Sequence, residues 1–369
     1  MWSASGLGDI MGRQGSAEVD ASTLEQFTPL QRVVLLANGN LQRLVSSFYN
    51  APVSVHTRYN TRVEDGLYER EVDLVVRNTI FARCTSTVRV TRDDCIHAIE
   101  HEGVAIGQLF RHFGILPTFE LRGAGSTPLA QAAGSEKDGE SDTFTSIKDR
   151  FWRQYVLSGE GIECNIHEDL RSDLFEWPFT SSLRDEADHT KPPEAIPSLG
   201  DIMAPATTFS SLPPGFTPVQ RLLLTANGNV ERILSAFYCK PAQIFVVLNS
   251  RRGAVYDRQV ALMLDGRQLM LAKSTCFVND EEWIRVAEAE QLPIGALFRR
   301  FNVLPTFTLH AAGVVPGGFW RQYQLRASDK LTCQINETFD ARCFDASGTS
   351  DARGLERVNS HCDQWGSVG

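Results

Sequence analysis

The spacing of apolar positions changes from a helical period to a strand period twice along the chain, in the same order each time. Apolar residues three and four apart predict a helix at 41–48 and another at 230–237. A shorter helix is predicted just before each of them, with Thr28 or Thr217 as N-cap and a proline in the first turn. An Asn-Gly pair ends each shorter helix, because glycine readily adopts the left-handed conformation found there.

Segments with strand character follow each helical pair and predict a sheet. They lie near 53–55, 68–76, 81–90, 151–158 and 162–168 in the first half, and near 244–248, 256–264, 269–278, 319–326 and 331–339 in the second. A further strand is predicted after each Leu-Pro-Thr-Phe, at 116 and at 304, behind a helical or turn segment with the pattern Ile-Gly-x-Leu-Phe. Each half is therefore predicted to be an α+β domain that contains a sheet.

The two halves repeat one unit. The pentapeptide Phe-Trp-Arg-Gln-Tyr occurs at 151–155 and again at 319–323, and Leu-Gly-Asp-Ile-Met occurs at 7–11 and again at 199–203. Because identical segments recur in the same order over almost the whole chain, the sequence predicts a tandem duplication.

The duplication predicts four regions: a first repeat at 1–180, a linker at 181–198, a second repeat at 199–346 and a disordered tail at 347–369. The offset between the copies falls from 188 at Ile106 to 168 at Phe151, so the first half holds 20 extra residues between these points. They predict a mobile surface loop around 123–149.

Composition narrows the choice of partners. The 369 residues carry a formal net charge of −9, which disfavours nucleic acid or an anionic membrane as the main partner. No apolar run approaches the roughly 20 residues of a membrane helix. The start of the chain lacks the basic and apolar regions of a secretory signal. The eight cysteines include no Cys-x-x-Cys pair, which favours reduced thiols in a cytoplasmic protein over a metal site. The sequence contains no nucleotide- or cofactor-binding motif, so no cofactor is predicted.

Four charged residues are placed on apolar strand faces. Arg70 and Arg258 lie at equivalent positions of one strand, and Glu168 and Glu337 lie at equivalent positions of the last strand. Burying a charge is costly unless it finds a partner, so one interpretation is a structural Arg–Glu pair. The other is a cavity in which the arginine binds an anion and the carboxyl group acts as a general acid.

Two further arginines share these faces. Arg153 and Arg321 are second candidates for binding the anion, or they brace the glutamates. A dyad of His167 with Glu168 is a less favoured alternative, because His167 is predicted to face outward and Asn336 replaces it in the second half.

The ordered set of these motifs, present twice, resembles the chorismate pyruvate-lyase family, which shares its fold with the ligand-binding domain of certain bacterial transcription regulators. The matching segments are Arg-Glu-Val or Arg-Gln-Val, the Ile-Gly-x-Leu-Phe segment and Ile-x-Glu on the last strand. The resemblance implies an antiparallel sheet with helices covering one side and a closed ligand cavity. The chain departs from the usual family pattern because it is duplicated. It also has Ala105 where the family has a proline, which the second half keeps as Pro293.

The resemblance also implies roles for particular residues. Arg70 and Arg258 would bind a ring carboxylate, assisted by backbone amides near Ile106 and Ile294, and the two glutamates would handle a proton. The implied activity is a cofactor-independent lyase that converts chorismate to 4-hydroxybenzoate and pyruvate, with the two repeats forming an intramolecular pseudo-dimer. The alternatives are a pocket repurposed for dehydration, cyclisation or isomerisation in secondary metabolism, and a non-catalytic small-molecule binding protein.

Overall fold

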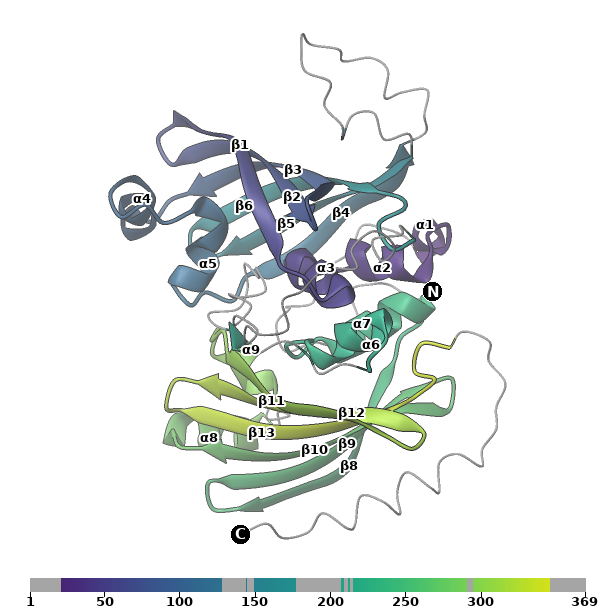
Figure 1. Ribbon diagram of the computed structural model, residues 1–369. Helices are drawn as coiled ribbons and strands as arrows, with labels where there is room; N and C mark the ends of the chain where they lie inside the picture. Colours follow the sequence, from purple (N-terminus) through teal and green to yellow (C-terminus); the bar gives the residue numbers. More distant parts are fainter. Residues whose placement is uncertain are drawn as a thin grey trace, which may run out of the picture.

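The chain folds into two sheets that face each other across a double layer of helices (Figure 1). The computed structural model describes residues 21–127, 144, 149–176, 207–208, 212, 215–290 and 295–345. Each half combines helices with a six-stranded antiparallel arrangement, so the predicted α+β class and the repeated sheet are confirmed. The proposed linker at 181–198 and tail at 347–369 lie outside the described residues.

The first domain contains three helices followed by three strands, and then three further helical segments followed by three strands. Its elements are α1 (Ala21–Glu25), α2 (Pro29–Leu35), α3 (Leu41–Tyr49), β1 (Val53–Glu64), β2 (Leu67–Val76), β3 (Thr79–Val90), α4 (Asp93–Glu100), η2 (Ile106–Gln108), α5 (Leu109–His112), β4 (Thr118–Thr127), β5 (Arg150–Gly159) and β6 (Ile162–Arg171). The strand order is β1-β2-β3-β6-β5-β4, with every neighbouring pair antiparallel.

The second domain has a similar order, but within the described residues it begins with a short additional strand and has two helices before each set of three strands. Its elements are β7 (Thr207–Thr208), α6 (Pro218–Leu224), α7 (Val230–Tyr238), β8 (Gln243–Arg252), β9 (Val255–Leu264), β10 (Arg267–Val278), α8 (Glu281–Ala289), α9 (Ala296–Arg300), β11 (Thr306–Val315), β12 (Gly318–Ala327) and β13 (Leu331–Asp340). The strand order is β7-β11-β12-β13-β10-β9-β8, in which the short β7 joins the edge of β11 in parallel.

The predicted helix boundaries are confirmed. The side chains of Thr28 and Thr217 each accept a hydrogen bond from the backbone of the third helical residue, and a glutamine at that position bonds back to the threonine amide. Gly39 has a φ of 88° and Gly228 a φ of 93°, the left-handed conformation expected at these helix ends.

The structure departs from the predictions in three ways. Several strands run further than the apolar pattern indicated, most clearly β1, whose exposed outer part gave no alternation signal. Helices α4 and α8 were not predicted, because each buries only two side chains and therefore has a weak apolar period. The predicted loop at 123–149 begins too early, since β4 continues to Thr127; most of the remainder lies outside the described residues.

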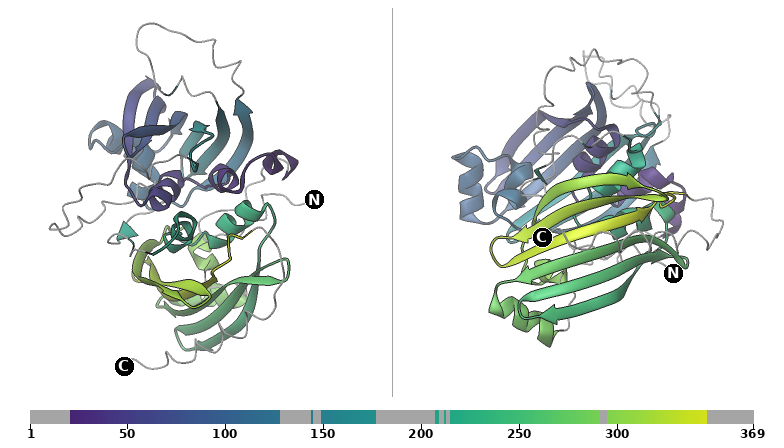
Figure 2. Two further views of the ribbon diagram at one scale, coloured as in Figure 1. Left: turned by 45° about the vertical axis from the view of Figure 1, so that its right-hand side comes forward. Right: turned by 60° about the horizontal axis from the view of Figure 1, so that its bottom comes forward.

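The central helices join the domains by exchanging arginines. Helix α2 packs against α7 and α3 against α6 (Figure 2). Arg32 donates to the carbonyls of Ala236 (3.0 Å) and Phe237 (2.7 Å) at the end of α7. Arg221 makes the equivalent bonds to Ser47 (2.8 Å) and Phe48 at the end of α3. Because a helix C-terminus carries partial negative charge, these guanidinium groups stabilise the contact. Among the described helices none is long and apolar enough to cross a membrane.

Candidate functional site

The strand side chains predicted to form the site lie on the sheet faces that are turned toward the central helices. Strand pairing places them in two rows per domain. In the first domain the rows are Arg70, Ser86, Ile166, Tyr155 and Val72, Cys84, Glu168, Arg153; in the second they are Arg258, Ser274, Ile335, Tyr323 and Val260, Ala272, Glu337, Arg321. The face assignments made from the sequence therefore hold for every described candidate.

Glu168 is bound on both carboxylate oxygens. Nε of Arg153 donates to one oxygen at 2.6 Å, and the hydroxyl of Tyr155 donates to the other at 2.8 Å. Arg153 is completely buried and Glu168 is 5% exposed, so the pair is shielded from solvent. Arg153 therefore braces the glutamate, which is one of the two roles considered for it. Both carboxylate oxygens of Glu168 are bound by side chains of the protein itself.

Arg153 also ties the sheet to helix α2. Its Nη1 donates to the carbonyls of Val34 at 2.7 Å and Ala37 at 2.5 Å, where α2 ends. Burial disfavours the guanidinium charge, but the Glu168 carboxylate together with Tyr155 and Cys84 outweighs this and raises the pKa of Arg153. Burial, reinforced by the same carboxylate, raises the pKa of the Tyr155 phenol well above its ordinary value, which keeps it a hydrogen-bond donor. Nη2 of Arg153 has no hydrogen-bond partner among the described residues.

The second domain repeats the arrangement. Nε of Arg321 donates to Glu337 at 2.7 Å, and the Tyr323 hydroxyl donates to the other oxygen at 2.8 Å. Nη1 of Arg321 bonds to the carbonyls of Leu224 at 3.2 Å and Ala226 at 2.5 Å, at the end of α6. The same four-part contact in both domains is what a structural role in the fold would produce.

Arg70 has a different environment from Arg153. It lies on β2, separated from Glu168 on β6 by the intervening strand β3 and by one row of side chains. Its guanidinium group packs against the turn at Gly107, where an ideal Cβ would lie 3.1 Å from Nη1. The structure thus brings Arg70 beside the Ile106 segment, as the resemblance implied.

No acidic group of the described residues forms an ion pair with Arg70. Burial lowers the pKa of this arginine, and the groups that act in the opposite direction are the thiols of Cys84 and Cys164 rather than a carboxylate. A largely desolvated cation without an anion of its own is suited to receive an anionic ligand, because such a ligand would restore the interactions lost on burial.

Arg258 occupies the equivalent position in the second domain. Its Nε is buried and has no hydrogen-bond partner among the described residues. The thiols of Cys276 and Cys333 lie close by on neighbouring strands; hydrogen bonding to Cys333, with a smaller contribution from Arg258, lowers the pKa of Cys276. Ile294, the predicted counterpart of Ile106, lies outside the described residues.

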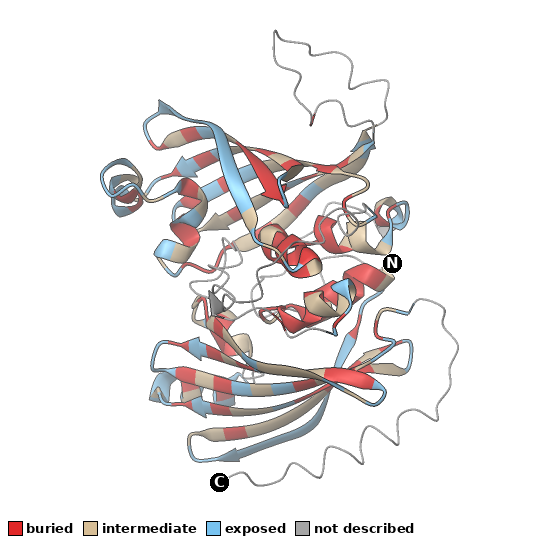
Figure 3. Ribbon diagram, viewed as in Figure 1, coloured by how far each residue is buried: buried red, intermediate tan, exposed pale blue. Residues whose placement is uncertain are grey.

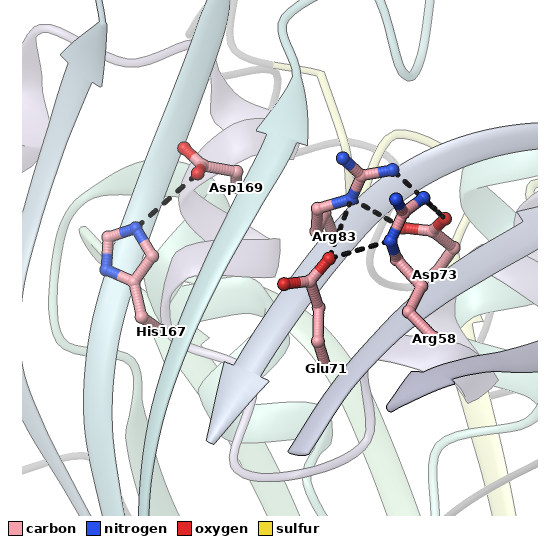
Figure 4. A network of polar contacts seen from close by, with 6 residues as sticks. All are labelled: Arg58, Glu71, Asp73, Arg83, His167 and Asp169. Atoms are coloured by element: carbon pink, nitrogen blue, oxygen red, sulfur yellow. Dashed lines mark hydrogen bonds and ion pairs between the residues drawn. The ribbon is translucent and has the colours of Figure 1, made fainter. Parts of the chain in front are cut away.

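The opposite face of the first sheet carries a separate polar network (Figure 4). Asp73 accepts from Arg83 Nε at 2.8 Å and from Arg58 Nη1 at 3.3 Å, and Glu71 pairs with Arg58 at 2.8 Å. His167 lies on this face, where it stacks on Trp152 with ring centroids 5.5 Å apart. The outward orientation expected for His167 is confirmed, and it separates this imidazole from Glu168.

Two buried arginines of the central helices gave no signal in the sequence. Arg43 in α3 lies 5.8 Å from the ring centroid of Phe307 in the other domain, and Arg232 in α7 lies 5.7 Å from that of Phe119. Each residue stands among apolar helix positions, so only their equivalent positions in the two repeats could have marked them.

The comparisons give no further guidance, because neither a protein-family model nor a curated protein matches the chain. Within the described part of the chain, no group of three or more His, Cys, Asp and Glu side chains is placed to hold a metal ion.

Proposed function

We propose that the protein binds a small ring carboxylate on the inner face of each sheet and acts as a cofactor-independent lyase of the chorismate-lyase type. The observation that carries the proposal is the environment of Arg70: a largely buried guanidinium group beside Gly107, with no acidic partner among the described residues. Arg258, whose Nε is buried and unbonded in the described structure, supports the same role in the second domain.

The reaction would be an elimination from chorismate. The bond between the ring and the enolpyruvyl oxygen breaks, the departing oxygen receives a proton, and the ring loses a proton as it becomes aromatic. The products are 4-hydroxybenzoate and pyruvate, the latter by tautomerisation of the enol. Arg70 or Arg258 would hold the ring carboxylate through the planar fork of its guanidinium group. Glu168 or Glu337, each of which is bound by a buried tyrosine and arginine, would protonate the departing enolpyruvyl oxygen.

A second candidate is a non-catalytic protein that binds the same class of ligand. It is favoured by the hydrogen bonds on Glu168, since Arg153 and Tyr155 already occupy one oxygen each. A carboxylate held in this way has to give up a partner before it reaches a substrate atom. The two candidates share the arginine site and differ only in whether turnover follows binding.

The test combines binding with product formation. Chorismate and 4-hydroxybenzoate are titrated into the full chain by calorimetry, and pyruvate release is followed with a coupled dehydrogenase. We expect Arg70→Met combined with Arg258→Met to abolish binding, while Arg89→Met, which changes an exposed arginine on the opposite face of the same sheet, leaves it unchanged. Binding without pyruvate release would select the non-catalytic candidate, and no binding of either acid would reject both.

A further inference from the structure

Strand β8 exposes an apolar segment at the free edge of the second sheet. Five consecutive side chains, Ile244 to Leu248, are each between 49% and 58% exposed. Successive residues of a strand point to opposite faces, so the segment is apolar on both faces. Strand β8 ends the sheet order and, within the described residues, pairs only with β9 (Figure 3). An exposed, apolar edge strand is a template for pairing with another strand.

The first domain shows that the fold itself does not require these residues. Strand β1 holds the same edge position and is exposed along almost its whole length. The pairing registers place His56, Thr57 and Arg58 of β1 where β8 has the apolar run Phe245–Val247. Both strands have a register irregularity at this point, so the irregularity does not account for the difference in composition.

The replacement extends to the neighbouring strands. In the first domain Arg58 takes part in the polar network that covers the outer face beside the edge (Figure 4). At the equivalent positions the second domain has no charge: Val247 for Arg58, Ala261 for Asp73 and Leu271 for Arg83. The second domain has therefore exchanged a charged edge for an apolar one within the same fold.

We propose that β8 pairs antiparallel with β8 of a second copy of this chain, giving a twofold dimer with one continuous sheet. Pairing centred on Val246 sets Ile244 opposite Leu248 and Phe245 opposite Val247. Gln243 then lies opposite Asn249, so apolar side chains meet apolar ones and polar meet polar. A twofold contact is closed, and it uses up the apolar edge on both copies.

The remaining sequence favours this occupant over the chain's own segments. Outside the described residues the longest apolar run is three residues, Ile202 to Ala204, which does not match five. The charges that follow the apolar run are already paired within the chain, Arg251 with Glu288 and Arg252 with Asp257. A second β8 therefore brings a matching apolar strand without adding an unpaired charge.

Sedimentation equilibrium of the full chain tests the proposal. At about 10 µM, a concentration at which edge contacts of micromolar affinity are populated, we expect twice the single-chain mass of 41.0 kDa. The variant Phe245→His/Val246→Thr/Val247→Arg places the β1 residues in β8 and should return the mass to that of one chain. The matched control Val55→Thr/Tyr59→Thr removes exposed apolar residues from β1 and should leave the double mass.

Cross-linking tests the register of the paired strands. It also tests the dimer independently of whether the triple variant folds. In Val246→Cys the two introduced thiols face each other across the twofold axis, so mild oxidation should give a covalent dimer, whereas Ser250→Cys should not. Single-chain mass at ten times the stated concentration, or a double mass retained by a folded triple variant, would overturn the proposal. So would a chain ending at residue 345 that dimerises when the full chain does not, because the tail would then be the occupant.

Discussion

Arg43 and Arg232 are exchanged between the two domains. Arg43 Nη1 donates to the Thr225 carbonyl at 3.3 Å, and Arg232 Nη1 donates to the Leu36 carbonyl at 3.3 Å. Each arginine thereby reaches the end of the first central helix of the other domain. With Arg153 and Arg321 bonding to the same helix ends from the sheets, two guanidinium groups converge on each terminus. Their charge opposes the partial negative charge of the helix carbonyls.

Replacing Arg43 by methionine should destabilise the protein. Methionine fills much of the same space but leaves the buried Thr225 carbonyl without this donor, and an unsatisfied buried acceptor costs about 1–3 kcal/mol. Urea denaturation measures the change in the free energy of unfolding. Arg89→Met, at an exposed position, should change that free energy by less than about 0.5 kcal/mol. Equal stability of Arg43→Met and the unaltered protein would show that the exchange does not stabilise the interface.

Breaking the buried pair of the first domain should have a larger effect. Arg153→Met leaves the Glu168 charge buried without its cation and removes the donor to the end of α2, so we expect a loss of about 3–5 kcal/mol. Urea denaturation again measures the loss. The double variant Arg153→Met/Glu168→Gln removes the stranded charge as well and should recover part of it. A double variant less stable than Arg153→Met alone would contradict this explanation.

Gly107 should control access to the Arg70 guanidinium group. A Cβ at this position would lie 3.1 Å from Nη1 of Arg70, and the flexible end of the arginine can move away at little cost to the fold. We therefore expect Gly107→Ala to weaken carboxylate binding by about tenfold, or roughly 1.4 kcal/mol, with nearly unchanged stability. Calorimetric titration measures the affinity. In the Arg70→Met background the alanine should have no additional effect on affinity. A similar loss of affinity there would show that Gly107 does not act through Arg70.

The protein should lose stability in alkaline solution. Burial raises the pKa of Tyr68 to about 12 and that of Tyr238 to about 12, against about 10 for an unfolded tyrosine. Above pH 10 the unfolded chain loses phenolic protons that the folded chain retains, so the free energy of unfolding falls as pH rises from about 10 to about 12. Urea titrations at several pH values measure the slope. Tyr68→Phe/Tyr238→Phe should flatten it, and an unaltered slope would exclude these two phenols as its cause.

Local rules were sufficient for the starts of α2 and α6, the strand faces and the repetition of the fold. The caps at Thr28 and Thr217 depend on a few neighbouring residues, and the alternation along β6 and β13 depends on which side chains are apolar. These features were predictable because each is set by residues close together in the chain.

The partners of the charged residues were not predictable in the same way. The sequence placed Arg70, Arg153 and Glu168 on one face, but it did not say which arginine would reach the carboxylate. Strand order decided this: β5 lies directly beside β6, whereas β3 separates β2 from β6. Pairing between strands follows long-range register, which the sequence of a single strand does not contain.

By itself the sequence determined that this protein is a duplicated α+β unit and that each copy turns a glutamate and two arginines toward an apolar interior. Only the tertiary structure decided that Arg153 and Arg321 satisfy the glutamates, that Arg70 is left beside Gly107, and that arginines cross between the domains. The physical reason is distance: periodicity fixes which face a side chain takes, while the contacts that cap the central helices join groups far apart in the chain, such as Arg153 and Val34, which are 119 residues apart and meet only after the chain has folded.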